Sequence, residues 1–238
     1  MTRCHTHHHS PTWHCSAQTT PLKLLHSRST GSGQYQGVKM EKKQLLNVGC
    51  GPLGREHGFS GFEDWQEVRL DIDASVQPDV IGTMTDMSAV PSGSIDAIVS
   101  SHNIEHLYPH EVPLALAEFV RVLKPDGLVL ITCPDLQSVC AQVAQGALAS
   151  PLYESPAGPI SALDILYGHR GAMAAGNLYM AHRCGFTLQV LADTMRACGF
   201  AKSVGRARPA HYDLYLLAAK QAISDDAIRK LAARHLPV

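Results

Sequence analysis

Charged residues are scarce in this chain, at 17% of its 238 residues against roughly 25% in an average globular protein. The 20 basic and 21 acidic residues nearly cancel, which disfavours a nucleic-acid binder acting through bulk electrostatics. No run of apolar residues is long enough for a transmembrane helix. The seven cysteines include no Cys-x-x-Cys pair, which excludes a zinc ribbon and a thioredoxin-type site. Without an apolar signal-peptide core near the start, we expect a cytoplasmic protein.

Residues 1–39 differ in composition from the rest of the chain and show no sustained period of 2 or 3.6. Six of the fourteen histidines lie there. They are His5, His7, His8, His9, His14 and His26. A metal-binding tail with Cys4 and Cys15 as further ligands is one interpretation. The spacing matches no zinc finger, so we favour a disordered extension that binds metal only incidentally.

A regular alternation begins after residue 40. Apolar runs predict strands over 44–48, 67–70, 79–81, 95–100 and 128–132, and helical spacing covers 109–123 and 187–198. Lys124-Pro125-Asp126-Gly127 predicts a turn. Residues 201–204 and 212–219 suggest a final antiparallel pair, and Ser224 is the expected cap of a helix ending near His235.

These elements predict an α/β fold with a doubly wound, mostly parallel sheet and an antiparallel C-terminal strand. The expected domain covers residues 40–220, followed by a helical tail over 221–238. Such sheets bind ligands beyond the carboxyl ends of their strands. Candidate site residues should therefore follow Val48, Leu70, Ile81 and Ser100.

The turn after the first strand reads Gly49-Cys50-Gly51-Pro52. Together with Asp71, which can accept both hydroxyls of a ribose, it indicates a cofactor that contains a nucleoside. Gly54 completes the dinucleotide spacing GxGxxG. Pro52 and the residues that follow nevertheless make a poor helix N-terminus, which a pyrophosphate requires. A nicotinamide oxidoreductase is therefore disfavoured, whereas a sulfonium cofactor has no phosphate to bind.

Five segments then occur in a telling order: LLNVGCGP, VRLDID, PDVIGTMTDM, SIDAIVSSHNIEHL and FVRVLKPDGLVLITCPD. In this series the chain resembles the class I S-adenosylmethionine-dependent methyltransferases, in the subgroup with an EHL segment after the fourth strand. The resemblance covers about residues 45–135 and continues more loosely to about 220. It implies S-adenosylmethionine as cofactor and methyl transfer to a small-molecule acceptor by in-line displacement. The alternative is a non-catalytic module of the same fold that binds the cofactor or a protein partner.

The resemblance also implies a set of cofactor-binding residues. They are Asn47, Gly49, Cys50, Gly51, Asp71, Ile72, Thr83, Met84, Ser101 and His102. The glycines would pass the methionyl part, Asp71 would bind the ribose, and Ile72 would lie against the adenine. Asn47 and Thr83 depart from the acidic residues common in the family. Asp86 is the expected replacement for the missing adenine contact at Thr83.

The segment His102-Asn103-Ile104-Glu105-His106 matches the HxxEH string of one zinc-protease class. A protease needs this string inside a helix, whereas here it follows a predicted buried strand. Some methyltransferases with an ExxEH segment bind magnesium there, but His102 suits that hard cation poorly. We therefore expect no metal, with Glu105 and His106 capping and orienting the helix after the fourth strand.

Residues 150–186 fall where the family commonly builds a lid over the acceptor. His169 and His182 in this stretch are the candidate catalytic residues, because a base is needed when the acceptor is a hydroxyl or a protonated amine. Tyr153, Tyr167 and Tyr179 are candidate aromatic walls. No basic stripe is present, so we expect no nucleic-acid partner. The lack of a long apolar run predicts no membrane span.

Overall fold

The computed structural model describes residues 42–52 and 58–237. The predicted extension over residues 1–39 lies outside the described residues, and so does Gly54 of the GxGxxG spacing. In the described part of the chain no helix has the length and hydropathy needed to cross a bilayer.

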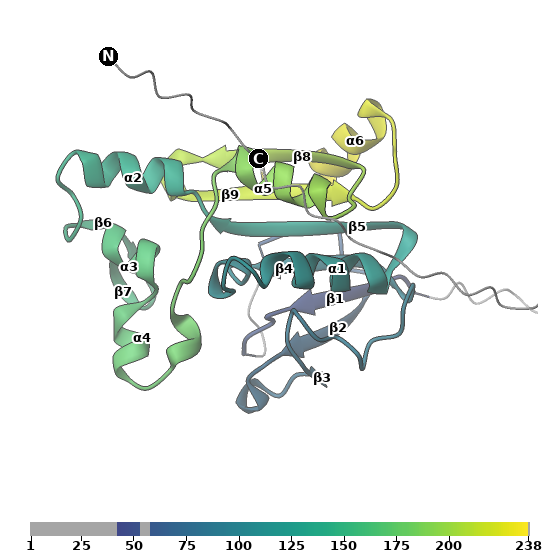
Figure 1. The fold of residues 1–238 in the computed structure, drawn as a ribbon, viewed down its shortest axis with the longest axis horizontal. Helices are drawn as coiled ribbons and strands as arrows, with labels where there is room; N and C mark the ends of the chain where they lie inside the picture. Colours follow the sequence, from purple (N-terminus) through teal and green to yellow (C-terminus); the bar gives the residue numbers. More distant parts are fainter. Residues whose placement is uncertain (1–41, 53–57, 238) are drawn as a thin grey trace, which may run out of the picture. The chain divides into compact units, whose positions relative to one another are not determined.

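The centre of the domain is a seven-stranded sheet in the order β3-β2-β1-β4-β5-β9-β8 (Figure 1). Five strands are parallel: β1 (Gln44–Val48), β2 (Gln66–Asp71), β3 (Val80–Ile81), β4 (Ile95–Ser101) and β5 (Leu123–Pro134). The strand β9 (Asp213–Ala219) runs antiparallel to both β5 and β8 (Lys202–Arg208). The predicted doubly wound sheet with an antiparallel C-terminal strand is confirmed.

The central strands form because both of their faces are covered. Successive residues of a strand point to opposite faces, and the structure assigns them to two separate cores. Leu46 and Ile98 belong to the core that contains Phe119. Leu45 and Val99 belong to the core that contains Ile228. A strand buried on both sides reads as an unbroken apolar run, which is why the sequence reveals it.

Three long helices cover these two cores. The helices α1 (Val112–Val122) and α5 (Leu188–Ala197) contribute apolar residues to one core, and α6 (Asp225–His235) contributes to the other. Thr187 caps α5 through the amide of Val190, and Ser224 caps α6 through the amide of Ala227. All three helices are close to their predicted ranges. A further helix, α2 (Leu136–Ala144), was not predicted.

The predicted turn over residues 124–127 lies within β5. The pairing of β4 with β5 jumps from Ile95 opposite Leu123 to Ala97 opposite Leu128. The intervening residues therefore bulge out of the ladder instead of separating two elements. Lys124 Nζ lies 2.8 Å from Asp96 Oδ2 and ties the bulge to β4.

The insert over residues 150–186 builds small elements of its own. It comprises the hairpin β6 (Pro151–Ser155) and β7 (Gly158–Ser161), the helices α3 (Ala162–Tyr167) and α4 (Arg170–Ala174), and the turn η3 (Leu178–Met180). Ile160, Ala162 and Ile165 pack with Val139 of α2 in a third, small core. A bridge between Asp135 and Phe186 joins the end of the insert to the end of β5. The insert is thereby fixed at the carboxyl ends of the parallel strands.

Candidate functional site

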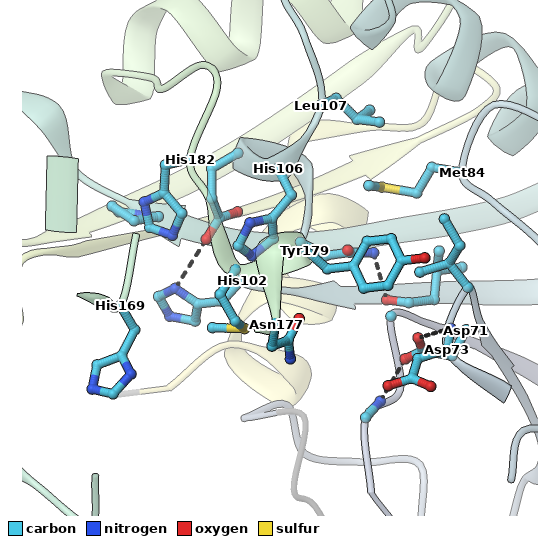
Figure 2. A pocket seen from close by; sticks show the side chains of 18 of the residues that line it. Asp71, Asp73, Met84, His102, His106, Leu107, His169, Asn177, Tyr179 and His182 are labelled. Atoms are coloured by element: carbon cyan, nitrogen blue, oxygen red, sulfur yellow. Dashed lines mark hydrogen bonds and ion pairs between the residues drawn. The ribbon is translucent and has the colours of Figure 1, made fainter. Parts of the chain in front are cut away.

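A cavity of about 600 Å³ opens at the carboxyl ends of β1, β2 and β4. One end is lined by the turns that follow these strands, including Gly49, Asp71 and Thr83. The other end is lined by the insert, including Tyr153. His169 and Tyr179 also line this end (Figure 2). The position matches the rule for doubly wound sheets, in which ligands bind at the switch point of the strand order.

The turn after β1 is held in a conformation that only glycine adopts without strain. Gly49 and Gly51 have φ angles of +70° and +62°. The amide of Gly49 donates to Leu70 O at 2.9 Å, and Asn103 Nδ2 donates to Val48 O at 3.1 Å. A Cβ on Gly49 would lie only 2.4 Å from Asn103 Cγ. Gly49, Gly51 and Asn103 line the cavity, with the Asn103 side chain packed where a Cβ on Gly49 would project.

Asp71 is the fixed carboxylate of the cavity. Its Oδ2 accepts the amide of Gly51 and its Oδ1 accepts the amide of Asp73, both at 2.9 Å. Oδ2 also accepts the Cys50 thiol at 3.9 Å. Each carboxylate oxygen has two lone pairs, so Oδ1 keeps one for a ligand hydroxyl and Oδ2 keeps one only if the weak thiol bond is given up. Arg69 supports the arrangement by donating to Gly51 O and Val76 O. The carboxylate is thus pre-oriented for a diol such as that of a ribose.

The structure brings together most of the ten predicted cofactor residues. Gly49, Gly51, Asp71, Ile72, Thr83, Met84 and His102 line the described cavity. Three others lie outside this lining. Asn47 donates to Glu67 Oε1 at 2.8 Å, Cys50 is buried, and Ser101 lies at the end of β4. Burial raises the pKa of the Cys50 thiol, which suits a packing role.

The expected replacement for Thr83 does not reach the cavity. Asp86 accepts the amide of Ser88 at 3.0 Å and is absent from the described lining. Thr83 Oγ1 instead accepts the amide of Asp86, which closes a tight turn. Thr83 and Met84 themselves form this part of the cavity wall.

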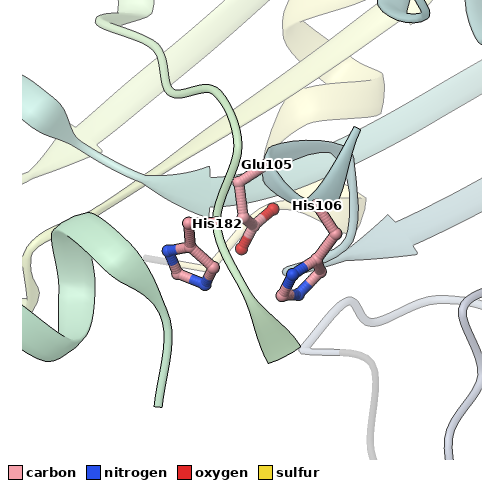
Figure 3. A group of neighbouring side chains, drawn as sticks. All are labelled: Glu105, His106 and His182. Carbon is pink, nitrogen blue, oxygen red and sulfur yellow. The ribbon is translucent and has the colours of Figure 1, made fainter. Parts of the chain in front are cut away.

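The buried carboxylate of Glu105 lies among three histidines. Only 1% of its side chain is exposed, and His102 Nδ1 lies 3.4 Å from its Oε1. Burial acts to raise the pKa of Glu105, but His102, His106 and His182 outweigh it and hold that pKa below its ordinary value. Figure 3 shows the carboxylate between His106 and His182. The cluster lines the cavity between the glycine turn and the insert.

His106 and His182 are each fixed through Nδ1. His106 Nδ1 lies 3.1 Å from Ala181 O, and His182 Nδ1 lies 2.7 Å from Ile165 O. Their ring centroids are 4.9 Å apart with the planes at 69°. Burial lowers the pKa of His182, which favours its neutral form. Burial and the nearby Glu105 raise the pKa of Cys184 to about 12, so that thiol stays protonated at neutral pH.

The expectation that Glu105 and His106 cap the following helix is wrong. They belong to the single 3-10 turn η2 (Ile104–His106), whereas α1 begins at Val112 with Glu111 at its N-cap position. The backbone of Glu105 instead accepts the amides of Arg183 and Cys184 from the insert. The short 3-10 turn also lacks the helix that the protease interpretation of HxxEH requires.

The two candidate catalytic histidines differ in their surroundings. His182 belongs to the cluster around Glu105. His169 lines the cavity, but its Nδ1 accepts the amide of Ala172 at 3.1 Å and caps α4. In that arrangement the Nδ1 lone pair of His169 is already used. Tyr153 and Tyr179 line the described cavity as predicted, whereas Tyr167 does not.

Two residues that shape the site were not predicted from the sequence. Asn103 fills the space beside Gly49, and Arg69 braces the turn through Gly51 O. Asn103 directly follows the predicted site residue His102, so its position after a buried strand was an available signal. Nothing in the local pattern marks Arg69, because its partners come from two different loops.

A family model described as a methyltransferase domain matches residues 46–131. No curated protein matches the chain.

Several solved structures are similar to the chain at low sequence identity. A possible exported protein from Bordetella parapertussis is 14% identical over 76% of this chain and 62% of its own, with a TM-score of 0.50. The 1,6-didemethyltoxoflavin-N1-methyltransferase of Burkholderia thailandensis, solved with S-adenosylhomocysteine and 1,6-didemethyltoxoflavin, is 17% identical over 76% and 72%, with a TM-score of 0.45. A possible histamine N-methyltransferase from Thermotoga maritima is 14% identical over 76% and 83%, with a TM-score of 0.47.

Proposed function

We propose that this chain, which is a class I S-adenosylmethionine-dependent methyltransferase, methylates a small molecule held between the glycine turn and the insert. The observation that carries the proposal is a continuous cavity with Asp71 at one end and Tyr153 and His169 at the other. Its volume of about 600 Å³ falls within the range of small-ligand sites. The cofactor occupies part of that space, which leaves room for a small acceptor.

The cofactor is proposed to lie over the turns that follow β1, β2 and β3. Gly49 and Gly51 would lie against its methionyl part because both line the cavity and neither has a side chain of its own. Asp71 would accept the two ribose hydroxyls. Ile72, which is 45% exposed beside Asp71, and Met84 would contact the adenine. Asn47 and Cys50 would support this turn from below without touching the cofactor.

The acceptor is proposed to enter from the insert. Tyr153 and Tyr179 are 41% and 53% exposed and line that end of the cavity. Amphipathic rings of this kind bind the faces of small organic molecules. Ile160 adds an apolar wall, whereas the histidine cluster supplies the polar groups. A chain with almost no net charge is less suited to hold a polyanionic acceptor such as nucleic acid.

The transfer itself is an in-line displacement. A lone pair of the acceptor forms a bond to the methyl carbon while the carbon–sulfur bond breaks, and that electron pair stays on sulfur to give S-adenosylhomocysteine. The protein's main task is to hold the two groups in line and away from water. An acceptor hydroxyl or ammonium must also lose a proton.

We propose that the histidine cluster, formed by His102, His106 and His182 around Glu105, accepts this proton. Of the two predicted bases, His182 belongs to the cluster, whereas the Nδ1 of His169 is occupied as a helix cap. His102 is the member most open to the cavity, with 42% of its side chain exposed, and its Nδ1 faces Glu105. A carboxylate in that position orients an imidazole and stabilises its charged form. His102 is therefore the proposed base and Glu105 its positioning residue.

Free thiols support the proposal that the protein works in a reducing compartment. Within the described residues Cys50, Cys133, Cys140 and Cys184 form no disulfide. Such thiols persist where the cell keeps them reduced.

The acceptor class is tested with methyl-labelled S-adenosylmethionine and a fractionated cell extract. At a limiting concentration of labelled cofactor, we expect label in the small-molecule fraction with wild-type protein and much less with the Asp71→Ala variant. Label confined to the protein or nucleic-acid fraction would overturn the small-molecule assignment. Replacing His102 by Gln should then lower kcat more than KM and remove the acidic limb of the pH profile, where a general base is lost by protonation.

A further inference from the structure

Glu105 carries a buried charge that the described residues leave without a hydrogen bond. Neither Oε1 nor Oε2 accepts one from any residue of the described chain, although the side chain is 1% exposed. His102 comes within 3.4 Å, outside good hydrogen-bond geometry. A buried carboxylate without donors is costly and calls for a specific partner.

The two neighbouring imidazoles each keep one nitrogen available. A carbonyl oxygen can only accept a hydrogen bond, so the contacts with Ala181 O and Ile165 O place the proton of His106 and of His182 on Nδ1. The Nε2 of each neutral ring then carries a free lone pair. An imidazole anchored by Nδ1–H to a backbone carbonyl has the arrangement usual for a metal ligand, because the anchor fixes both tautomer and ring orientation.

The three groups converge. One ligand atom each from Glu105, His106 and His182 lies within 4.8 Å of the others. Ligands about 2.0–2.1 Å from a zinc ion lie about 3.3 Å apart in a tetrahedron. The ligand atoms would therefore move closer to one another when an ion binds.

The backbone around the cluster is already fixed. The amides of Arg183 and Cys184 donate to Glu105 O at 2.8 and 3.2 Å, and Arg183 Nη1 donates to His106 O at 3.0 Å. These bonds join η2 to the insert segment that carries His182. His102 has a φ of +49°, a backbone conformation that non-glycine residues adopt mainly where the surrounding structure enforces it. The ligands are therefore held together before any ion binds.

We propose that Glu105, His106 and His182 form a site for a divalent transition-metal ion at the acceptor end of the cavity. Two imidazoles and one carboxylate suit zinc or a similar ion, whereas magnesium prefers oxygen ligands and water. Three protein ligands leave a coordination position open, as in catalytic zinc sites. Because all three residues line the cavity, that position faces the acceptor space.

The proposed ion indicates which chemical group of the acceptor is methylated. An oxygen donor such as a hydroxyl binds to the open position, and a hydroxyl on such an ion loses its proton more easily. The departing proton goes to His102 or to water. This role rests on the proposed methyl transfer, whereas metal binding itself does not.

The experiment must distinguish zinc binding at Glu105, His106 and His182 from zinc binding by the histidines and cysteines of residues 1–39. The starting protein is therefore the full-length chain with the six histidines and two cysteines of residues 1–39 replaced by alanine. Zinc affinity is measured by competition with a chromophoric chelator. We expect one zinc ion per chain and a loss of affinity of at least 100-fold in Glu105→Gln and in His182→Ala. His110→Ala is the matched control, because His110 stacks on Tyr108 outside the described cavity lining, and it should bind zinc like the parent.

Folding and cofactor binding are followed in the same samples. Thermal unfolding and S-adenosylhomocysteine affinity show whether each variant is intact, and His106→Ala replaces any variant that is not. Cobalt provides a second readout, since its visible bands should be lost with His182→Ala and kept with His110→Ala. No stoichiometric zinc in the parent, or zinc affinity unchanged in folded Glu105→Gln and His182→Ala, would overturn the metal site. Zinc binding without methylation of any small molecule would contradict only the proposed acceptor class.

Discussion

The side-chain amide of Asn103 occupies the space into which a Cβ on Gly49 would project, with Asn103 Cγ 2.4 Å from that position. Gly49→Ala should therefore destabilise the protein by about 2–4 kcal/mol. This sums about 1 kcal/mol for the left-handed backbone and about 1–3 kcal/mol for overpacking. The same change should weaken S-adenosylhomocysteine binding, because the turn must shift. Chemical denaturation and calorimetric titration measure the two effects.

A second glycine provides the control for Gly49. Gly93 has a similar φ of +66° but has no atom within 4 Å of its missing Cβ. Gly93→Ala should cost about 1 kcal/mol and leave ligand affinity unchanged. Adding Asn103→Ala to Gly49→Ala should recover part of the lost stability. Equal costs for the two glycine variants would show that Asn103 does not restrict the turn.

The insert is joined to the cluster through Gly168. A Cβ there would lie 1.9 Å from Met180 O, and Gly168 pairs with Ala181, whose carbonyl oxygen contacts His106. We expect Gly168→Ala to loosen residues 150–186 and to speed their cleavage in limited proteolysis. Affinity for S-adenosylhomocysteine should stay within about twofold, since the turns after β1 and β2 are untouched.

The variant Gly176→Ala distinguishes the effect of backbone strain from the effect of the clash with Met180 O at Gly168. Both residues have a φ of +98°, but Gly176 has open space at its Cβ position. In Gly176→Ala, residues 150–186 should therefore be cleaved nearly as slowly as in wild type. If both variants are cleaved equally fast, the contact with Met180 is not what holds the insert.

The ionised carboxylate of Asp164 makes the stability of the insert depend on pH. The guanidinium of Arg170, with help from Ser161, holds the pKa of the Asp164 carboxyl well below its usual range. A lowered folded-state pKa gives stabilisation that is complete above the unfolded pKa of about 3.9 and is lost as the pH falls below it. Asp164→Asn should lower the free energy of unfolding by about 1.5 kcal/mol at pH 7, the low end for bonds to charged groups.

Chemical denaturation between pH 7 and pH 3 tests whether the stabilisation from Asp164 is lost as the pH falls. The gap between wild type and Asp164→Asn should be constant down to about pH 4 and narrow below it. Asp126→Asn is the control, because Asp126 is exposed in the bulge of β5. A gap that is unchanged or wider at pH 3 would contradict the account of Asp164.

The sheet was predictable because its central strands are buried on both faces. Leu45, Leu46 and Val48 are at most 2% exposed, so burial leaves a continuous apolar run in the sequence. The helix α5 was predictable from its helical spacing, and α6 was predictable from its cap Ser224. The bulge after Leu123 was not, since Pro125 and Gly127 mark a turn equally well whether or not the strand resumes its pairing.

The insert and the cluster were only partly predictable. Helices as short as α3 and α4 have little intrinsic stability and depend on tertiary contacts, so their periodicity is weak. His182 was a candidate on its position alone. Its meeting with Glu105 depends on the hydrogen bonds of Arg183 and Cys184 to Glu105 O, which no local pattern encodes. By contrast, Gly49, Gly51 and Asp71 follow strand ends, where the topology alone brings them together.

The cofactor pocket is tested most directly by calorimetric titration of S-adenosylhomocysteine into wild type, Asp71→Ala and Asp86→Ala. Wild type should bind saturably. Asp71→Ala should lose about 10–100-fold in affinity, the equivalent of about 1.5–3 kcal/mol for hydrogen bonds to a charged group. Asp86→Ala should bind like wild type, because Asp86 bonds to Ser88 outside the described cavity. No binding by folded wild type, or full affinity in Asp71→Ala, would contradict the assignment of this cavity to S-adenosylmethionine.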